Sequence, residues 1–251
     1  MAKRSKRSLK QEQKFNTGRS NIEPIFESVD WDPLDEQIDN QRDKKYLKRV
    51  KPRSDGQKDL MDSIEENSLT IATGPAGTGK TYLAIAAAVE ALEDGEVERI
   101  VLSRPATDAG ESIGYLPGDM YEKMAPYLRP LFDALGDRLG GKRLRQYMED
   151  GTIEIAPVGF MRGRTLNNAF VVIDEAQNCT YQQLKMIVSR LGWHSTMVLT
   201  GDPDQSDLLD GLSGYRTLVS KLEWVEGIGI IELSQSDIVR HPLVAKMLDV
   251  L

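Results

Sequence analysis

One short motif constrains the fold of this chain more than any other feature: Gly-Pro-Ala-Gly-Thr-Gly-Lys-Thr at residues 74–81. The apolar, strand-like run 69–73 precedes it, and an alanine-rich run with helical character follows over 82–92. A glycine-rich loop between a strand and a helix binds phosphates, because its backbone N–H groups converge on anionic oxygens and the helix dipole adds to the field. The motif therefore predicts a phosphate-binding loop in an α/β protein.

The positions within this loop have separate predicted roles. The glycines permit backbone angles and a close approach that a Cβ would block. Lys80 can reach the β- and γ-phosphates of a nucleotide, and the Thr81 hydroxyl can bind Mg²⁺. The predicted nucleotide-binding residues of the loop are Gly74, Pro75, Ala76, Gly77, Thr78, Gly79, Lys80 and Thr81.

Composition limits the classes of protein that need to be considered. The 251 residues suit one large domain, or one domain with an appendage. A net charge of −7 argues against a uniformly basic nucleic-acid-binding body. Because Cys179 is the single cysteine, no internal disulfide can form and a cytoplasmic location is predicted. No run approaches the ~18 apolar residues of a membrane span, so no membrane partner is expected.

The first 50 residues differ in character from the rest of the chain. Residues 1–19 contain seven lysines and arginines against one glutamate, and no apolar period is sustained over residues 1–50. We expect a basic N-terminal extension over 1–50, poorly ordered or pinned to the core, and one domain over 51–251. The basic arm is compatible both with a solvated tail and with an arm that attracts nucleic-acid phosphates.

Beyond residue 51, apolar strand-like runs alternate with helical patterns. The predicted strands are 69–73, 99–103, 153–156, 170–174, 196–200 and 229–233. The predicted helices are 55–66 with Ser54 as its cap, 78–92, 120–135 with interruptions at Pro126 and Pro130, 142–149, 181–191, 215–221 and 242–251. Such alternation predicts an α/β fold with an open, mostly parallel sheet flanked by helices.

Two adjacent carboxylates, Asp174 and Glu175, follow the run 170–173. The β-branched character of this run is typical of a strand buried on both faces of a parallel sheet, and such sheets bind ligands beyond the carboxyl ends of their strands. Asp174 can hold Mg²⁺, directly or through water, and Glu175 can orient or deprotonate an attacking water. The alternative is an ordinary acidic exit from a strand, which the phosphate loop in the same chain disfavours.

A third motif, Thr-Gly-Asp-Pro-Asp-Gln at residues 200–205, ends the next predicted strand. The amide of Gln205 can donate to a γ-phosphate or position the attacking water. Without the other two motifs, the same residues would indicate a Gly-Pro turn with a surface glutamine.

In their order along the chain, these three motifs resemble those of superfamily 1 helicase motors. With four further segments, 103–106, 114–119, 160–168 and 237–242, the chain more closely resembles the PhoH family of P-loop ATPases. The resemblance covers about residues 54–251 and implies a RecA-like P-loop core that binds ATP and Mg²⁺ and hydrolyses ATP. We see no added RNA-binding or nuclease domain, so the chain looks like the short phage and bacterial forms.

The resemblance also implies a role for Gln57, which lies 17 residues before Gly74 on the first predicted helix. In the superfamily 1 pattern, a glutamine upstream of the phosphate loop binds adenine through its amide. The alternative is a solvated helix glutamine.

The chain has one motor core, whereas superfamily 1 helicases pair two, and the second core supplies an arginine to the γ-phosphate. Such an arginine is worth about 10³–10⁵ in rate. We therefore hypothesise that the chain forms a homo-oligomeric ring, with a hexamer favoured, in which a neighbour delivers the arginine. Arg240 is the first candidate, with a structural ion pair as its alternative, and Arg162 and Arg164 are further candidates. The predicted catalytic residues are Lys80, Glu175, Gln205 and Arg240.

Arginines on predicted loops suggest contact with a polymer. Arg104, Arg162 and Arg164 can face a single nucleic-acid strand, and Tyr115 and Phe160 can stack on bases, although Phe160 is also compatible with a place in the core. The favoured function is a Mg-dependent ATPase motor acting on RNA or single-stranded nucleic acid, with helicase activity left open. The alternative is an ATP-gated oligomeric switch that moves no strand. Phosphoryl transfer to a small acceptor is disfavoured, because Glu175 suits water activation.

Overall fold

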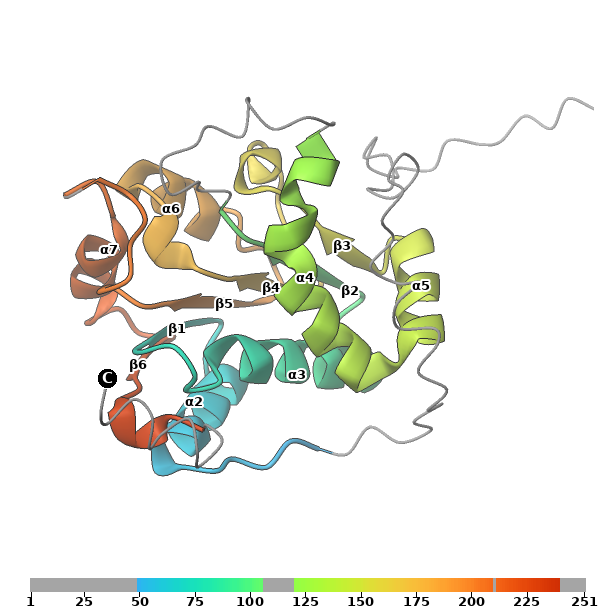
Figure 1. Ribbon diagram of the computed structural model, residues 1–251, viewed down its shortest axis with the longest axis horizontal. Helices are drawn as coiled ribbons and strands as arrows, with labels where there is room; N and C mark the ends of the chain where they lie inside the picture. Colours follow the sequence, from blue (N-terminus) through green and yellow to red (C-terminus); the bar gives the residue numbers. More distant parts are fainter. Residues whose placement is uncertain (1–48, 106–119, 210, 240–251) are drawn as a thin grey trace, which may run out of the picture.

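The computed structural model describes residues 49–105, 120–209 and 211–239. Within these residues, six parallel strands form one sheet in the order β3-β2-β4-β5-β1-β6 (Figure 1). The strands are β1 Leu69–Thr73, β2 Arg99–Ser103, β3 Ile153–Ile155, β4 Ala169–Ile173, β5 Thr196–Gly201 and β6 Ile228–Glu232. Each predicted strand is present, with ends displaced by at most one residue, and the predicted open parallel α/β fold is confirmed.

Helices cover both faces of this sheet (Figure 1). Their bounds are α2 Asp55–Glu66, α3 Lys80–Glu93, α4 Met120–Leu139, α5 Gly141–Glu149, α6 Tyr181–Val188 and α7 Tyr215–Leu222. Side chains alternate along a strand, so β4 serves two cores: Phe170 and Val172 pack with α2 to α5, whereas Val171 and Ile173 pack with α6 and α7. This double burial explains why β4 is apolar throughout.

The prediction that prolines interrupt the helix after residue 120 is wrong. Helix α4 runs for 20 residues through both Pro126 and Pro130. An interior proline costs about 3 kcal/mol, but the buried face of α4 offsets this cost, since each large apolar side chain contributes about 1.5–3 kcal/mol. The buried side chains of that face include Leu128, Leu131, Phe132 and Leu135.

Local signals set where the other helices begin. Ser54 caps α2 as predicted, and its hydroxyl accepts a hydrogen bond from the backbone N–H of Gln57 at 3.2 Å. Thr180 and Gln183 form a capping box at the start of α6. No helix in the described part of the chain is both long enough and apolar enough to cross a membrane. The predicted extension 1–50 lies outside the described residues except for Arg49 and Val50, and the predicted helix 242–251 lies outside them entirely.

The strand order decides which motifs meet. Strand β5 lies between β1 and β4, and β2 pairs with β4 on its other side. Thr73 is in register with Gly201, and Ser103 with Ile173, so these four strands end at the same edge of the sheet. Consequently the phosphate loop, the acidic pair and the segment carrying Gln205 lie together at the carboxyl edge, where such sheets bind ligands.

Candidate active site

The phosphate loop requires glycine at its first position. Gly74 has φ +135°, and a Cβ there would lie 2.2 Å from the carbonyl oxygen of Leu233. The N–H of Gly74 donates to the carbonyl of Gly201 at 3.2 Å, which fixes the loop to the end of β5. Gly79, also at positive φ, precedes α3, and the backbone therefore turns directly from the loop into the helix.

Lys80 is the first residue of α3 and is buried. Its ammonium group donates to the carbonyl oxygens of Gly74 at 2.6 Å and Pro75 at 2.8 Å. Burial lowers the pKa of Lys80, and the nearby carboxylates, led by Asp202, oppose that effect. The positive charge of Lys80 is therefore held inside the loop, on the side where carboxylates gather.

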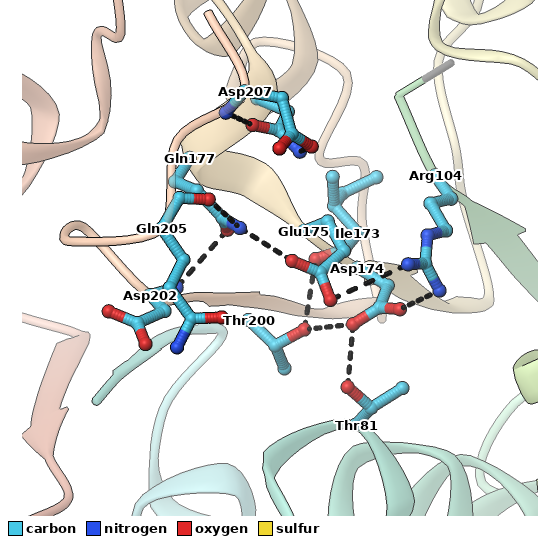
Figure 2. Close-up of polar contacts among 11 residues, drawn as sticks. Thr81, Arg104, Ile173, Asp174, Glu175, Gln177, Thr200, Asp202, Gln205 and Asp207 are labelled. Carbon is cyan, nitrogen blue, oxygen red and sulfur yellow. Dashed lines mark hydrogen bonds and ion pairs between the residues drawn. The ribbon is translucent and has the colours of Figure 1, made fainter. Parts of the chain in front are cut away.

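Asp174 connects the loop to the end of β4 (Figure 2). Its Oδ1 accepts hydrogen bonds from the hydroxyls of Thr81 at 2.6 Å and Thr200 at 2.8 Å. Its Oδ2 lies 3.3 Å from Nη1 of Arg104. The structure thus brings together the two residues predicted to bind Mg²⁺, Thr81 and Asp174.

Glu175 adopts a left-handed backbone conformation, with φ 53° and ψ 42°. For a residue other than glycine this conformation costs about 1–2 kcal/mol, and such strain concentrates at functional sites. Oε2 of Glu175 accepts a hydrogen bond from Nε2 of Gln177 at 2.5 Å, and Oε1 lies 3.6 Å from Nη2 of Arg104. The turn therefore places the carboxylate between the side chains of Gln177 and Arg104, which hold it in position.

Gln177 joins the acidic turn to the segment after β5, a role that the sequence analysis missed. Only 1% of its surface is exposed. Besides Glu175, its Nε2 donates to the carbonyl of Gln205 at 3.2 Å, and its Oε1 accepts from the N–H of Asp202 at 3.1 Å. The signal in the sequence was its position two residues after Glu175, a predicted catalytic residue.

These groups line one cavity of about 580 Å³. Its lining residues include Lys80, Thr81, Asp174, Glu175 and Gln205. Helix α4 adds residues that the motifs did not point to, namely Pro130, Asp133, Ala134 and Asp137. The cavity therefore combines two cationic side chains, Lys80 and Arg104, with several carboxylates.

Gln57 lies behind the phosphate loop, with 5% of its surface exposed, so the alternative of a solvated helix glutamine is wrong. Its Nε2 donates to the carbonyl of Thr78 at 2.9 Å, and its Oε1 accepts from the N–H of Arg53 at 2.9 Å. Both ends of the amide thus bind backbone groups of the chain, and Gln57 supports the loop from α2.

The family model described as "PhoH-like protein" matches residues 49–251. The chain belongs to this family. The PhoH-like protein of Bacillus subtilis (strain 168) is 51% identical over 203 residues, which make up 80% of this chain and 64% of that protein. Protein PhoH of Escherichia coli (strain K12) is 42% identical over 216 residues, or 85% of this chain and 61% of that protein.

The chain therefore spans less than two thirds of the length of these PhoH-like relatives. Among solved structures, the large terminase of a thermophilic bacteriophage aligns with a TM-score of 0.51 at 11% identity, over 79% of this chain and 50% of that one. A crystal form of the terminase in complex with ADP aligns with a TM-score of 0.50, at the same identity and coverage. At this identity the likeness concerns the fold alone, and it confirms the predicted RecA-like P-loop architecture.

The residues present in the PhoH-like chain fit a magnesium-bound nucleotide. A hydroxyl and a carboxylate, from Thr81 and Asp174, are the oxygen ligands that Mg²⁺ prefers, and they lie 2.6 Å apart. Gly77 and Gly79, both at positive φ, line the cavity with backbone and without a side chain, as a loop that binds phosphates requires. Lys80 supplies a buried positive charge at the wall of the cavity. The donor set is therefore suited to phosphates and a divalent cation.

The arginines predicted to contact nucleic acid occupy three different environments. Arg104 faces the carboxylates of the cavity, whereas Arg162 is exposed. Arg164 forms two hydrogen bonds of 2.6 and 2.7 Å with Glu154, which raise the pKa of Arg164. Phe160 is 42% exposed, so the alternative that it belongs to the core is wrong.

Two of the predicted residues, Arg240 and Tyr115, lie outside the described residues. The neighbour of Arg240 is described: Val239 donates its backbone N–H to the carbonyl of Gly77 at 3.0 Å. The segment that leads to Arg240 is therefore hydrogen-bonded to the phosphate loop of its own chain.

Proposed function

We propose that this PhoH-like chain is a Mg-dependent ATPase that binds and hydrolyses ATP in the cavity at the carboxyl edge of its sheet. The observation that carries the proposal is the convergence of Lys80, the Thr81–Asp174 pair and Glu175, which come from two segments far apart in the sequence, on one cavity. Side chains of these types in this arrangement suit phosphoryl transfer to water.

Within this proposal, Lys80 and the backbone N–H groups of the loop hold the β- and γ-phosphates. Thr81 and Asp174 hold Mg²⁺, which when bound neutralises charge on the phosphate oxygens. Glu175 orients the attacking water and accepts its proton, and the amide of Gln205 helps to position that water. Gln57 supports the loop from behind through its bond to Thr78. From the superfamily 1 resemblance, we also propose that it contacts adenine.

Full catalytic rate would depend on a second copy of the chain. We propose a head-to-tail ring, with a hexamer favoured, in which a neighbour supplies an arginine to the γ-phosphate. The resemblance to superfamily 1 motors supports this idea, because in those motors the arginine comes from outside the core that carries the phosphate loop. Arg240 and the exposed Arg162 are the candidates, whereas Arg164 is already paired with Glu154.

The proposed target is RNA or single-stranded nucleic acid in the cytoplasm. Exposed Phe160 and Arg162 lie close together, on the short 3-10 helix Val158–Met161 and at its end, and they offer one stacking surface and one charge to a strand. Two exposed leucines, Leu209 and Leu212, favour the alternative function, an ATP-gated binding switch. They follow Gln205 in the chain, and Gln177 joins Gln205 to Glu175 by hydrogen bonds.

Steady-state ATP hydrolysis with and without single-stranded RNA and DNA distinguishes the two functions. The motor predicts strong stimulation by a polymer that disappears in Glu175→Gln. The switch predicts no stimulation by either polymer, together with oligomerisation that depends on ATP. Glu65→Gln, on the exposed side of α2, is the matched control, because it makes the same chemical change and removes the same charge outside the cavity. Absence of hydrolysis under every condition would refute the ATPase proposal.

A further inference from the structure

Arg104 lies between the two carboxylates that the proposed function needs most (Figure 2). Its guanidinium is 3.3 Å from Oδ2 of Asp174 and 3.6 Å from Oε1 of Glu175, and its side chain is 20% exposed. The arrangement follows from the sheet. Arg104 comes directly after β2, and the N–H of Asp174 donates to the carbonyl of Ser103 at 2.8 Å, so adjacent strand ends place the three groups together.

The other oxygen of each carboxylate already has partners. Oδ1 of Asp174 accepts from the hydroxyls of Thr81 and Thr200, and Oε2 of Glu175 accepts from Gln177. Arg104 occupies the sides that remain. One guanidinium therefore neutralises part of the charge of two carboxylates, through the oxygens that the neighbouring hydroxyls and Gln177 leave open.

We propose that Arg104 is an internal counter-ion. It pairs with Asp174 and Glu175 in the absence of metal, and it would be displaced from them when Mg²⁺ binds. The inference rests on the proposed function, because it assigns a positioning role at the same site. Arg104 and Mg²⁺ are both positive and compete for the same carboxylates, so each weakens the binding of the other. Release of Arg104 frees Oε1 of Glu175 to take a water proton.

Removing Arg104 should affect the affinity for Mg²⁺ differently if it is a counter-ion than if it binds substrate. If Arg104 bound phosphate of a nucleotide or a polymer, its removal would weaken binding and leave the affinity for the metal alone unchanged. If Arg104 is the counter-ion, its removal leaves two uncompensated carboxylates. The protein then loses stability in the absence of divalent cations and gains affinity for Mg²⁺.

The test is thermal unfolding of the full chain during titration with MgCl₂ at constant ionic strength and without nucleotide. We expect Arg104→Gln to melt at a lower temperature than the wild type without Mg²⁺, and to reach half of its Mg²⁺-dependent stabilisation at an about 10-fold lower concentration. Arg99→Gln is the matched control, since it removes the same charge at the other end of β2, where Arg99 hydrogen-bonds to the exposed carbonyl of Asn167. Its half-saturating concentration should equal that of the wild type.

Arg104→Lys keeps the measurement decisive if Arg104→Gln does not fold. A lysine retains the charge but lacks the fork that reaches both carboxylates, so its half-saturating Mg²⁺ concentration should also fall below that of the wild type. An equal or higher concentration in the folded variants, or no response to Mg²⁺ in them, would overturn the proposal. Because no nucleotide is present, a failure to hydrolyse ATP would not affect this result.

Discussion

Replacing Gln177 by methionine is expected to damage stability and catalysis together. The substitution keeps the length of the side chain and its burial but removes every hydrogen bond of the amide. Three bonds are lost, to the Glu175 carboxylate, the Gln205 carbonyl and the Asp202 N–H. The last two are backbone groups, which would be left without this partner at the edge of the sheet.

The magnitude follows from these three bonds. A hydrogen bond to a charged group contributes about 1.5–3 kcal/mol, and an unsatisfied buried backbone group costs about 1–3 kcal/mol. Because water can reach part of the loop and these values are not additive, we expect a loss of about 3 kcal/mol in the free energy of unfolding. For a domain of this size, that corresponds to a fall of about 6–12 °C in Tm. With Glu175 no longer held, kcat should fall by about 10- to 100-fold while KM changes little.

Urea unfolding gives the stability change, and steady-state ATP hydrolysis gives the kinetic change. Gln182→Met is the control, because Gln182 is exposed on α6, and a surface substitution of this kind should stay within about 0.5 kcal/mol. A loss below about 1 kcal/mol in Gln177→Met, with kcat unchanged, would refute the claim that this amide joins the acidic turn to the segment after β5.

Three further outcomes follow from single residues. Gly74→Ala should cost about 3 kcal/mol and abolish ATP binding in a calorimetric titration, because its Cβ would lie 2.2 Å from the Leu233 carbonyl, whereas Gly95→Ala, with open space at its Cβ, should cost only about 1 kcal/mol. Burial raises the pKa of the Cys179 thiol to about 12, so iodoacetamide at pH 8 should label it only after unfolding, and rapid labelling of the native chain would contradict this. Hydrogen bonds, first from the Ser234 backbone, lower the pKa of Asp237. The ionised Asp237 therefore stabilises the fold fully above about pH 3.9, the pKa of an aspartate in the unfolded chain, and this stabilisation is lost as pH falls through the lower pKa of the folded state. In urea unfolding, Asp237→Asn should therefore be destabilised fully at pH 7 and progressively less below about pH 4.

Much of the fold could be predicted from the sequence, because local chemistry and long-range packing agree there. The run 170–173, a phenylalanine followed by three β-branched residues, is apolar because both of its faces are buried, and this composition strongly favours a central strand. The loop 74–81 combines glycines, a lysine and a threonine in an order that strongly indicates one kind of site. The prediction failed at α4, where the packing of a long apolar face outweighs the local cost of Pro126 and Pro130.

The candidate site was predictable in its motifs but not in the contacts between them. That Thr81 and Asp174 would meet followed from the edge of the sheet that both motifs share. The direction of Arg104 depended on the pairing of β2 with β4, which no local pattern encodes. The role of Gln177 could not be predicted, because it depends on the turn at Glu175 that brings the amide of Gln177 beside the segment after β5. Such contacts depend on strand order, and a sequence pattern carries little information about strand order.

Single-turnover hydrolysis of radiolabelled ATP by the wild type and by Glu175→Gln tests the central claim most directly. The account predicts that both proteins bind Mg–ATP with similar affinity, and that release of phosphate falls by about 10²-fold or more in the variant, since it retains the loop but lacks a group that can accept the water proton. Equal rates of phosphate release in the two proteins would contradict the assignment of Glu175 as the water-activating residue and, with it, the proposed mechanism of this cavity.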